Sequence, residues 1–202
     1  MRAVAQSRDQ KLLDGIIKHK YLRTDQAAEI YFSNIKDPHQ RRQKASTRLL
    51  RLYQRHLVQR FQFPGEPFIY TCSGTKYSPK IHHYMAINDV LIQFLSLVPN
   101  GSRLEYEIEH PLGENIIADL FMHYTNEFRG TQRNLCIEVE LENTADIQAK
   151  ITKYEEYADD HPDIELIVIC KHKRTIDRIK SHAYDLPVQA IDMRFIREQF
   201  KF

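Results

Sequence analysis

The spacing of apolar residues divides the first 72 residues into three helices and a hairpin. Apolar positions at helical spacing predict helices over residues 9–21, 24–32 and 39–56, with Thr24 as the N-cap of the second. Alternation then predicts strands over residues 57–63 and 68–72, which the turn Pro64-Gly65-Glu66-Pro67 joins. Three helices followed by a hairpin is the order of a winged helix, and the third helix enters the major groove in helix-turn-helix proteins.

The rest of the chain mixes helices and strands. Its pattern predicts helices over residues 82–98, 146–158, 174–183 and 194–200, and strands over residues 104–109, 116–124, 135–141, 165–170 and 188–191. A turn is expected at Pro111-Leu112-Gly113. The predicted fold class is α/β (α+β), with an N-terminal winged helix-turn-helix domain over residues 1–80 and a mixed-sheet α/β domain over residues 81–202.

Charge is distributed unevenly between these two parts. Residues 1–83 contain 16 Lys or Arg and 6 Asp or Glu, whereas residues 84–202 contain 13 and 21, although the whole chain has a net charge of only +2. This division favours two modules, one basic and one acidic. Two oppositely charged faces of a single domain are the alternative.

The third predicted helix carries a row of cations. On a helix, five basic residues fall within an arc of about 80°: Arg41, Lys44, Arg48, Arg51 and Arg55. No acid occurs between Pro38 and Pro64. A solvated surface helix usually mixes charges of both signs, so a row of one sign favours binding to a polyanion such as DNA.

Further DNA contacts are expected around this row. Gln40, Gln43 and Thr47 lie near the start of the same helix, where they are expected to read base edges. Arg60 on the hairpin is expected to touch the adjacent DNA backbone. A winged helix that binds proteins instead of DNA is the alternative.

Three carboxylates occur on two predicted neighbouring strands. Asp119 belongs to the strand at residues 116–124, whereas Glu138 and Glu140 are two residues apart in the next strand and therefore share a face. Oxygen ligands suit Mg²⁺ or Mn²⁺, and such ions activate water and hold the phosphodiester in two-metal nucleases. The solvent-facing acidic side of an ordinary hairpin is the alternative.

Short motifs recur along the whole chain: Leu12-Leu13-Asp14-Gly15-Ile16, Tyr21-Leu22-Arg23-Thr24-Asp25-Gln26, Thr47-Arg48-Leu49-Leu50-Arg51-Leu52, His82-His83-Tyr84-Met85-Ala86-Ile87-Asn88-Asp89, Ala118-Asp119, Glu138-Val139-Glu140 and Lys150-Ile151-Thr152-Lys153-Tyr154. Together they resemble the replication-relaxation family of bacterial plasmids and other mobile elements. The resemblance implies an N-terminal winged helix that binds DNA and a role in plasmid replication, relaxation or transfer.

The order of the C-terminal elements also resembles the core of the PD-(D/E)XK nucleases. This likeness implies that Asp119 and Glu138 are the metal-binding carboxylates. The catalytic lysine is then expected at residue 140, where this chain has Glu140. Lys150 and Lys153 on the following helix are the candidates for a migrated cation, and Lys150 is preferred because it matches the family motif. A lysine there would steady the attacking water or the charge of the transition state.

Three functions stay open from the sequence. The first is a DNA-binding accessory protein of mobile-element replication, relaxation or transfer. The second is a Mg²⁺- or Mn²⁺-dependent endonuclease targeted by its winged helix, and the third is a protein–protein scaffold with a relict nuclease fold. Expected partners are double-stranded DNA and replication or conjugation proteins, and a homodimer is one option for the oligomeric state.

The sequence also bears on where the protein is expected to work. Its three cysteines are well separated, which is typical of a reducing compartment. No apolar run approaches the ~20 residues that span a bilayer, and the N-terminus has no apolar stretch of the signal-peptide type. We therefore expect a cytoplasmic protein without a membrane partner.

Overall fold

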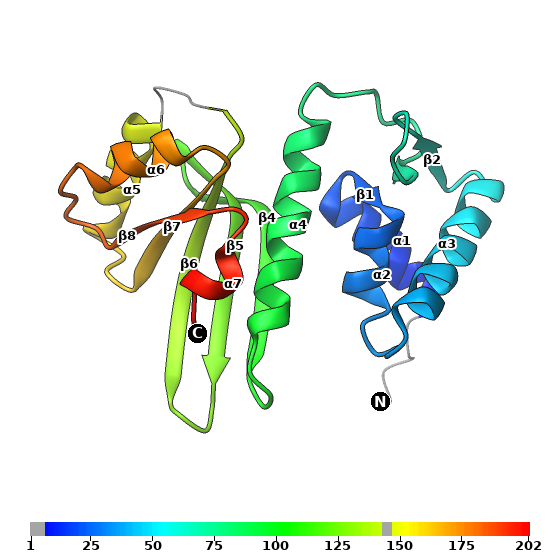
Figure 1. Ribbon diagram of the computed structural model, residues 1–202, viewed down its shortest axis with the longest axis horizontal. Helices are drawn as coiled ribbons and strands as arrows, with labels where there is room; N and C mark the ends of the chain where they lie inside the picture. Colours follow the sequence, from blue (N-terminus) through cyan, green and yellow to red (C-terminus); the bar gives the residue numbers. More distant parts are fainter. Residues whose placement is uncertain (1–6, 143–146) are drawn as a thin grey trace. The chain divides into compact units, whose positions relative to one another are not determined.

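The computed structural model describes residues 7–142 and 147–202 and divides the chain into two compact units, Met1–Ile92 and Gln93–Phe202 (Figure 1). The helix α4 (Ile81–Leu97) runs across this division, so that each unit contains part of it. The predicted domain boundary after residue 80 lies immediately before this helix. Among the described residues, no helix is long and apolar enough to cross a membrane.

The first unit contains three helices and a small sheet before α4. Its elements are α1 (Arg8–His19), β1 (Leu22–Arg23), α2 (Thr24–Tyr31), α3 (Pro38–Gln54), β2 (Val58–Phe61) and β3 (Ile69–Cys72). The strands form an antiparallel sheet in the order β1-β3-β2. Apolar residues from all three helices and the sheet form one core, which includes Leu12, Ile16, Leu22, Ala27, Ala45, Leu49, Leu52, Val58 and Tyr70. The predicted helices and hairpin are therefore present.

Two details of this unit differ from the prediction. The strand β1 was not predicted, because two residues are too short to show alternation; Leu22 pairs with Tyr70 of β3. The N-cap of α2 is Arg23, so the prediction that Thr24 fills this position is wrong. Thr24 is the first helical residue, and its hydroxyl donates to the carbonyl of Phe68 at 3.2 Å instead.

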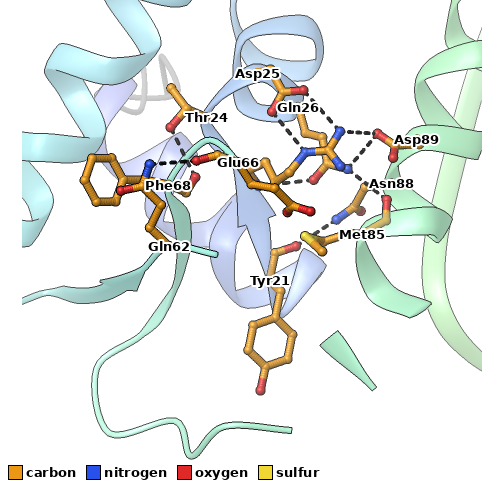
Figure 2. Close-up of polar contacts among 11 residues, drawn as sticks. Tyr21, Thr24, Asp25, Gln26, Gln62, Glu66, Phe68, Met85, Asn88 and Asp89 are labelled. Carbon is orange, nitrogen blue, oxygen red and sulfur yellow. Dashed lines mark hydrogen bonds and ion pairs between the residues drawn. The ribbon is translucent and has the colours of Figure 1, made fainter. Parts of the chain in front are cut away.

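The turn between α1 and β1 is strained, and a buried amide holds it. Lys20 has φ 59° and ψ −48°, and the Tyr21 N–H donates to the His19 carbonyl at 2.6 Å. This is the geometry of a γ-turn with positive φ, which is rare and costly for a residue with a Cβ. The fully buried Asn88 of α4 binds both flanks of the turn. Its Oδ1 contacts Nδ1 of His19 at 2.5 Å. Its Nδ2 donates to the Tyr21 carbonyl at 2.8 Å (Figure 2). Because Oδ1 of Asn88 is an acceptor, Nδ1 of His19 carries the proton.

A second polar cluster links α2 to α4 (Figure 2). Gln26 is 1% exposed, and its Nε2 donates to the Met85 carbonyl at 2.8 Å and to Oδ1 of Asp89 at 2.7 Å. Its Oε1 accepts from the main-chain N–H of Arg23 at 3.1 Å. The Arg23 guanidinium binds the carboxylates of Asp89, at 2.9 Å, and Asp25, at 3.1 Å. The buried amide is therefore fully bonded, as a polar group inside a protein requires.

The second unit is built on a five-stranded mixed sheet. The strands β4 (Arg103–Gly113), β5 (Ile116–Asn126), β6 (Thr131–Glu140), β7 (Ile164–Cys170) and β8 (Val188–Asp192) follow each other in the sheet as they do in the sequence. The pairs β4–β5 and β5–β6 are antiparallel, whereas β6–β7 and β7–β8 are parallel. The helices α5 (Ile147–Ala158) and α6 (Lys173–Lys180) connect the parallel strands and share one core with them (Figure 1). The short α7 (Ile196–Gln199) follows β8.

Both faces of the central strand are covered. Residues 135–139 of β6 are all buried, which is typical of an interior strand in a mixed sheet. The helix α5 contributes Ile147, Ile151 and Tyr154 to the core. At the C-terminus, Phe202 stacks on Tyr124 of β5 at 4.4 Å between ring centroids, and Phe200 packs against Phe94 at the end of α4 at 4.9 Å.

Most predicted elements of this unit are present, and one turn was placed wrongly. The residues Pro111-Leu112-Gly113 belong to β4, and the turn falls at residues 114–115. Proline is tolerated there because β4 is an edge strand, and the β4–β5 register shifts between Pro111 and Gly113. The helix predicted over residues 146–158 begins at Asp146, which lies outside the described residues. The fold is mixed α/β with two sheets.

The buried His19 makes the first unit sensitive to acid. Burial lowers the pKa of His19 from 6.5 to about 4, so between these pH values the unfolded chain binds a proton that the folded chain does not. Stability should therefore be complete above pH 6.5 and fall by up to about 3 kcal/mol as the pH approaches 4. Urea unfolding at a series of pH values, followed by hydrogen exchange in α1 and α2, measures this. His19→Gln should lose this part of the pH dependence; an unchanged profile would contradict the assignment.

Candidate functional site

The helix α3 presents one face to the core and one to solvent. Asp37 caps its start by accepting from the His39 N–H at 2.9 Å, and Pro38 occupies the first helical position. Ala45, Leu49 and Leu52 are buried. The side turned to solvent carries most of the residues predicted to contact DNA, which are exposed: Gln40, Gln43, Lys44, Thr47, Arg51 and Arg55.

Two of the predicted DNA-contacting cations are bound to acids of neighbouring helices. Arg41 pairs with Glu29 of α2 and donates to the Ile35 carbonyl at 3.0 Å. Arg48 pairs with Asp9 of α1 at 2.5 Å. Local sequence does not reveal these two partners, because Glu29 and Asp9 lie 12 and 39 residues away along the chain. Both arginines therefore also join the three helices to each other.

The remaining cations of the row are free to meet solvent on α3. Lys44, Arg51 and Arg55 are exposed, and so is Arg42, which lies outside the predicted row. Thr47 donates its hydroxyl proton to the Gln43 carbonyl at 2.9 Å. The exposed surface of α3 keeps a strong excess of positive charge together with amide and hydroxyl groups.

Arg60 of β2 is held between two aromatic rings beside this surface. Its guanidinium carbon lies 4.3 Å from the ring centroid of Tyr53 and 4.3 Å from that of Phe68. Both rings remain partly exposed, and cation–π contacts of this kind fix the direction of a guanidinium group. The role of the two rings could not be predicted from the sequence, since neither residue is near Arg60 along the chain.

In the second unit, three predicted site residues come together at the junction of β5, β6 and α5. The β5–β6 ladder ends at the pair Leu120–Ile137. Just beyond it, the carboxylate of Asp119 accepts from the main-chain N–H of Val139 at 2.8 Å. Glu138 is 0% exposed, and Lys150 of α5 donates to its Oε2. Asp119, Glu138 and Lys150 therefore form one cluster.

Tyr154 is a member of this cluster that sequence reasoning left without a role. It lies one turn after Lys150, and its hydroxyl donates to Oε1 of Glu138. The spacing of four residues between Lys150 and Tyr154 places both on one face of α5, which was a signal available in the sequence. The two oxygens of Glu138 thus have different donors.

Burial and charge shift the protonation of the cluster. Burial, followed by the negative charge of Asp119, raises the pKa of Glu138 well above its ordinary value, and the Lys150 ammonium opposes this. Burial disfavours the charged form of Lys150, but the charges of Glu138 and Asp119 outweigh it and raise the pKa of Lys150. Lys150 is therefore a cation at neutral pH. Burial also raises the pKa of Tyr154, so its hydroxyl stays a donor.

Glu140 and Lys153 lie beside the cluster and line a cavity of about 400 Å³, which also takes in Ile117, Ala149 and Lys150. Among residues 7–142 and 147–202, no group of three or more His, Cys, Asp or Glu side chains is placed to hold a metal ion. The donor chemistry of Asp119 and Glu138, two carboxylates on adjoining strands, nevertheless fits Mg²⁺ or Mn²⁺. No protein-family model, curated protein or solved structure matches the chain.

The hydroxyl of Tyr154 should contribute measurably to the stability of the second unit. Tyr154→Phe keeps the buried ring but leaves Oε1 of the fully buried Glu138 without its donor, which should cost about 1–3 kcal/mol. Urea unfolding of the intact chain measures the loss. Tyr157→Phe, on the same helix but at a partly exposed position, should change stability by less than about 0.5 kcal/mol. Equal effects of the two substitutions would contradict the role given to Tyr154.

Proposed function

We propose that this chain is a DNA-binding protein whose first unit acts as a winged helix. The carrying observation is the solvent face of α3, where Lys44, Arg51 and Arg55 lie opposite the buried seam of the same helix. In this arrangement α3 enters the major groove and its cations meet phosphates. Gln40 and Gln43 at the start of the helix then reach base edges.

The hairpin supports the same proposal. Arg60, held between Tyr53 and Phe68, presents its charge from β2 as a wing would, toward the DNA backbone next to the groove. Arg41 and Arg48, which are paired with acids, act mainly in holding the three helices together. We assign direct phosphate contact chiefly to the exposed cations.

The biological setting that we propose follows from the sequence motifs. Their resemblance to the replication-relaxation family favours an accessory protein of mobile-element replication, relaxation or transfer. The acidic second unit then contacts DNA, a metal ion or a replication or conjugation protein, while the basic first unit holds the DNA.

DNA binding should be salt-dependent in a way that reports on α3. If about four phosphates are neutralised, the slope of log K against log salt is about −3.6, and Lys44→Gln with Arg51→Gln should bring it to about −1.8. Fluorescence anisotropy with a labelled duplex over a salt series measures the slope. The loss of affinity should be similar for all sequences, because phosphate contacts carry no sequence information.

The matched control makes the same change in net charge at a site outside α3. Lys173→Gln with Lys180→Gln alters two exposed lysines of α6 in the second unit, and it should leave the slope unchanged. If both double variants flatten the slope equally, the binding reports overall charge and the winged-helix proposal fails.

The cluster of Asp119, Glu138 and Lys150 favours a second candidate function, a metal-dependent DNA endonuclease. Asp119 and Glu138 would hold Mg²⁺ or Mn²⁺ through carboxylate oxygens. A bound ion of this kind supplies Lewis-acid activation of water and neutralises charge on the phosphodiester. Lys150 already contacts Glu138 and would balance the charge of the two carboxylates.

The endonuclease proposal predicts Mn²⁺-dependent nicking of supercoiled plasmid. Asp119→Asn and Lys150→Gln should each reduce nicking by roughly 10²-fold or more, since the first removes a carboxylate that would hold the metal ion and the second removes a cation beside the reacting phosphate. Gel analysis of nicked and linear product, with Mn²⁺ titration calorimetry on the same variants, separates loss of metal from loss of chemistry. Asp160→Asn, at an exposed position after α5, is the matched control.

Two outcomes would contradict the endonuclease proposal. Equal nicking by the wild type and all variants would indicate a contaminating nuclease. No nicking at all, with DNA binding intact, would favour a second unit that acts as a protein–protein scaffold.

A further inference from the structure

The first unit contains a cavity of about 300 Å³ that the proposed DNA contacts do not use. The end of α1, the strand β3, the segment at residues 73–80 and the start of α4 surround it. Its volume lies at the lower end of the range for small-molecule sites, roughly 300–1,000 Å³. Three features of its lining point to a ligand.

The first feature is a buried hydroxyl. Thr71 lines the cavity and is 1% exposed, and its Oγ1 has no hydrogen-bond partner among the described residues. Its main chain is already used, because Thr71 pairs with Gln59 in the β2–β3 ladder. A buried polar atom of this kind is rare in native proteins and calls for an explanation. A ligand atom that exchanges a hydrogen bond with Oγ1 supplies one.

The second feature is a cation that a strained turn places at the cavity. Lys20 lies at the centre of the γ-turn with positive φ, and its side chain lines the cavity. Its Nζ donates to the hydroxyl of Tyr84 at 3.1 Å and lies 5.0 Å from the centroid of that ring. Strained residues cluster at ligand sites, where the surrounding structure holds them.

The third feature is an aromatic wall made by two tyrosine rings tilted by 39° to each other. The rings of Tyr21 and Tyr84 lie 5.6 Å apart between centroids, and both line the cavity. The Tyr21 hydroxyl donates to the Lys76 carbonyl at 3.0 Å, which holds the segment at residues 73–80 beside the cavity. Ile17, which is 58% exposed, adds an apolar side chain at the same cavity. These groups suit a planar hydrocarbon body.

We propose that this cavity is a binding site for a small aromatic carboxylate. The carboxylate is bound by Nζ of Lys20, the aromatic body lies against Tyr21 and Tyr84, and one ligand oxygen bonds Oγ1 of Thr71. A charge-assisted hydrogen bond to the ammonium group provides much of the affinity.

Cys72 gives a direct readout of occupancy that does not depend on DNA. Cys72 is a lining residue of the cavity and is partly exposed, whereas Cys136 and Cys170 are fully buried in the second unit. The probe is naphthalene-2-carboxylate, with the neutral naphthalene-2-carboxamide as its match. Alkylation of Cys72 by N-ethylmaleimide, followed by mass spectrometry of the intact protein, reports whether the cavity is filled. The two buried thiols report that the second unit stays folded, and the melting temperature reports on the first.

The carboxylate should slow alkylation of Cys72 by roughly tenfold or more at saturation, and the carboxamide should not. Lys20→Gln should weaken protection by roughly tenfold, while Lys11→Gln, which removes a charge from an exposed position of α1, should leave it unchanged. Thr71→Val should also weaken protection without lowering the melting temperature, because the lost hydroxyl has no partner within residues 7–142 and 147–202.

Three results would each overturn the proposal. They are equal protection by the carboxylate and the carboxamide, undiminished protection in Lys20→Gln, and no protection by the carboxylate at millimolar concentration in a protein whose other two thiols stay unreactive.

Discussion

The two hydrogen bonds of the buried Asn88 amide are the contacts on which the polar interior of the first unit depends. A γ-turn with positive φ at a residue with a Cβ is costly, and Asn88 holds it by binding the residues on both sides, His19 and Tyr21. Burial lowers the pKa of His19 and keeps it neutral inside the protein, although the bond to Asn88 opposes this, and the turn that Asn88 holds places Lys20 at the cavity. Gln26 fixes the start of α2 in the same manner. Asn88 thus fixes a strained turn and Gln26 fixes a helix start, neither of which apolar packing alone would specify.

Two of the motifs that carry the family resemblance bind each other in this network. The segment Tyr21–Gln26 supplies Arg23 and Gln26, and the segment His82–Asp89 supplies Asn88 and Asp89. A mutual requirement between distant segments explains in physical terms why both contain such specific polar residues. Local periodicity reveals each segment separately, because it reports only neighbours along one element. It cannot reveal their pairing.

The same limit separates what could be predicted from what could not. The apolar seam of α3 follows from its own sequence, so the helix and its solvent face were predictable. The ion pairs of Arg41 and Arg48 were not, because Glu29 and Asp9 reach them only through tertiary packing. In the second unit, alternation placed Asp119 and Glu138 on adjoining strands, and their meeting with Lys150 followed from the position of α5. The contact of the Tyr154 hydroxyl with Glu138 was not predicted, since a tyrosine in a core is usually present for its ring.

The features that lower the stability of the two units share a common position in the structure. A buried ion pair such as Lys150–Glu138 is a weak source of stability, since apolar residues of similar volume often serve as well or better. The Thr71 hydroxyl, which has no hydrogen-bond partner in the described part of the chain, and the strained backbone of Lys20 reduce stability outright. Lys150, Thr71 and Lys20 each line a cavity, whereas the apolar cores around them follow the ordinary rules of packing. Residues that sacrifice stability in this way and lie at a cavity are expected where a site must bind a ligand or react with it. Each unit therefore has its own candidate site, and the stability lost at that site is offset by the surrounding core.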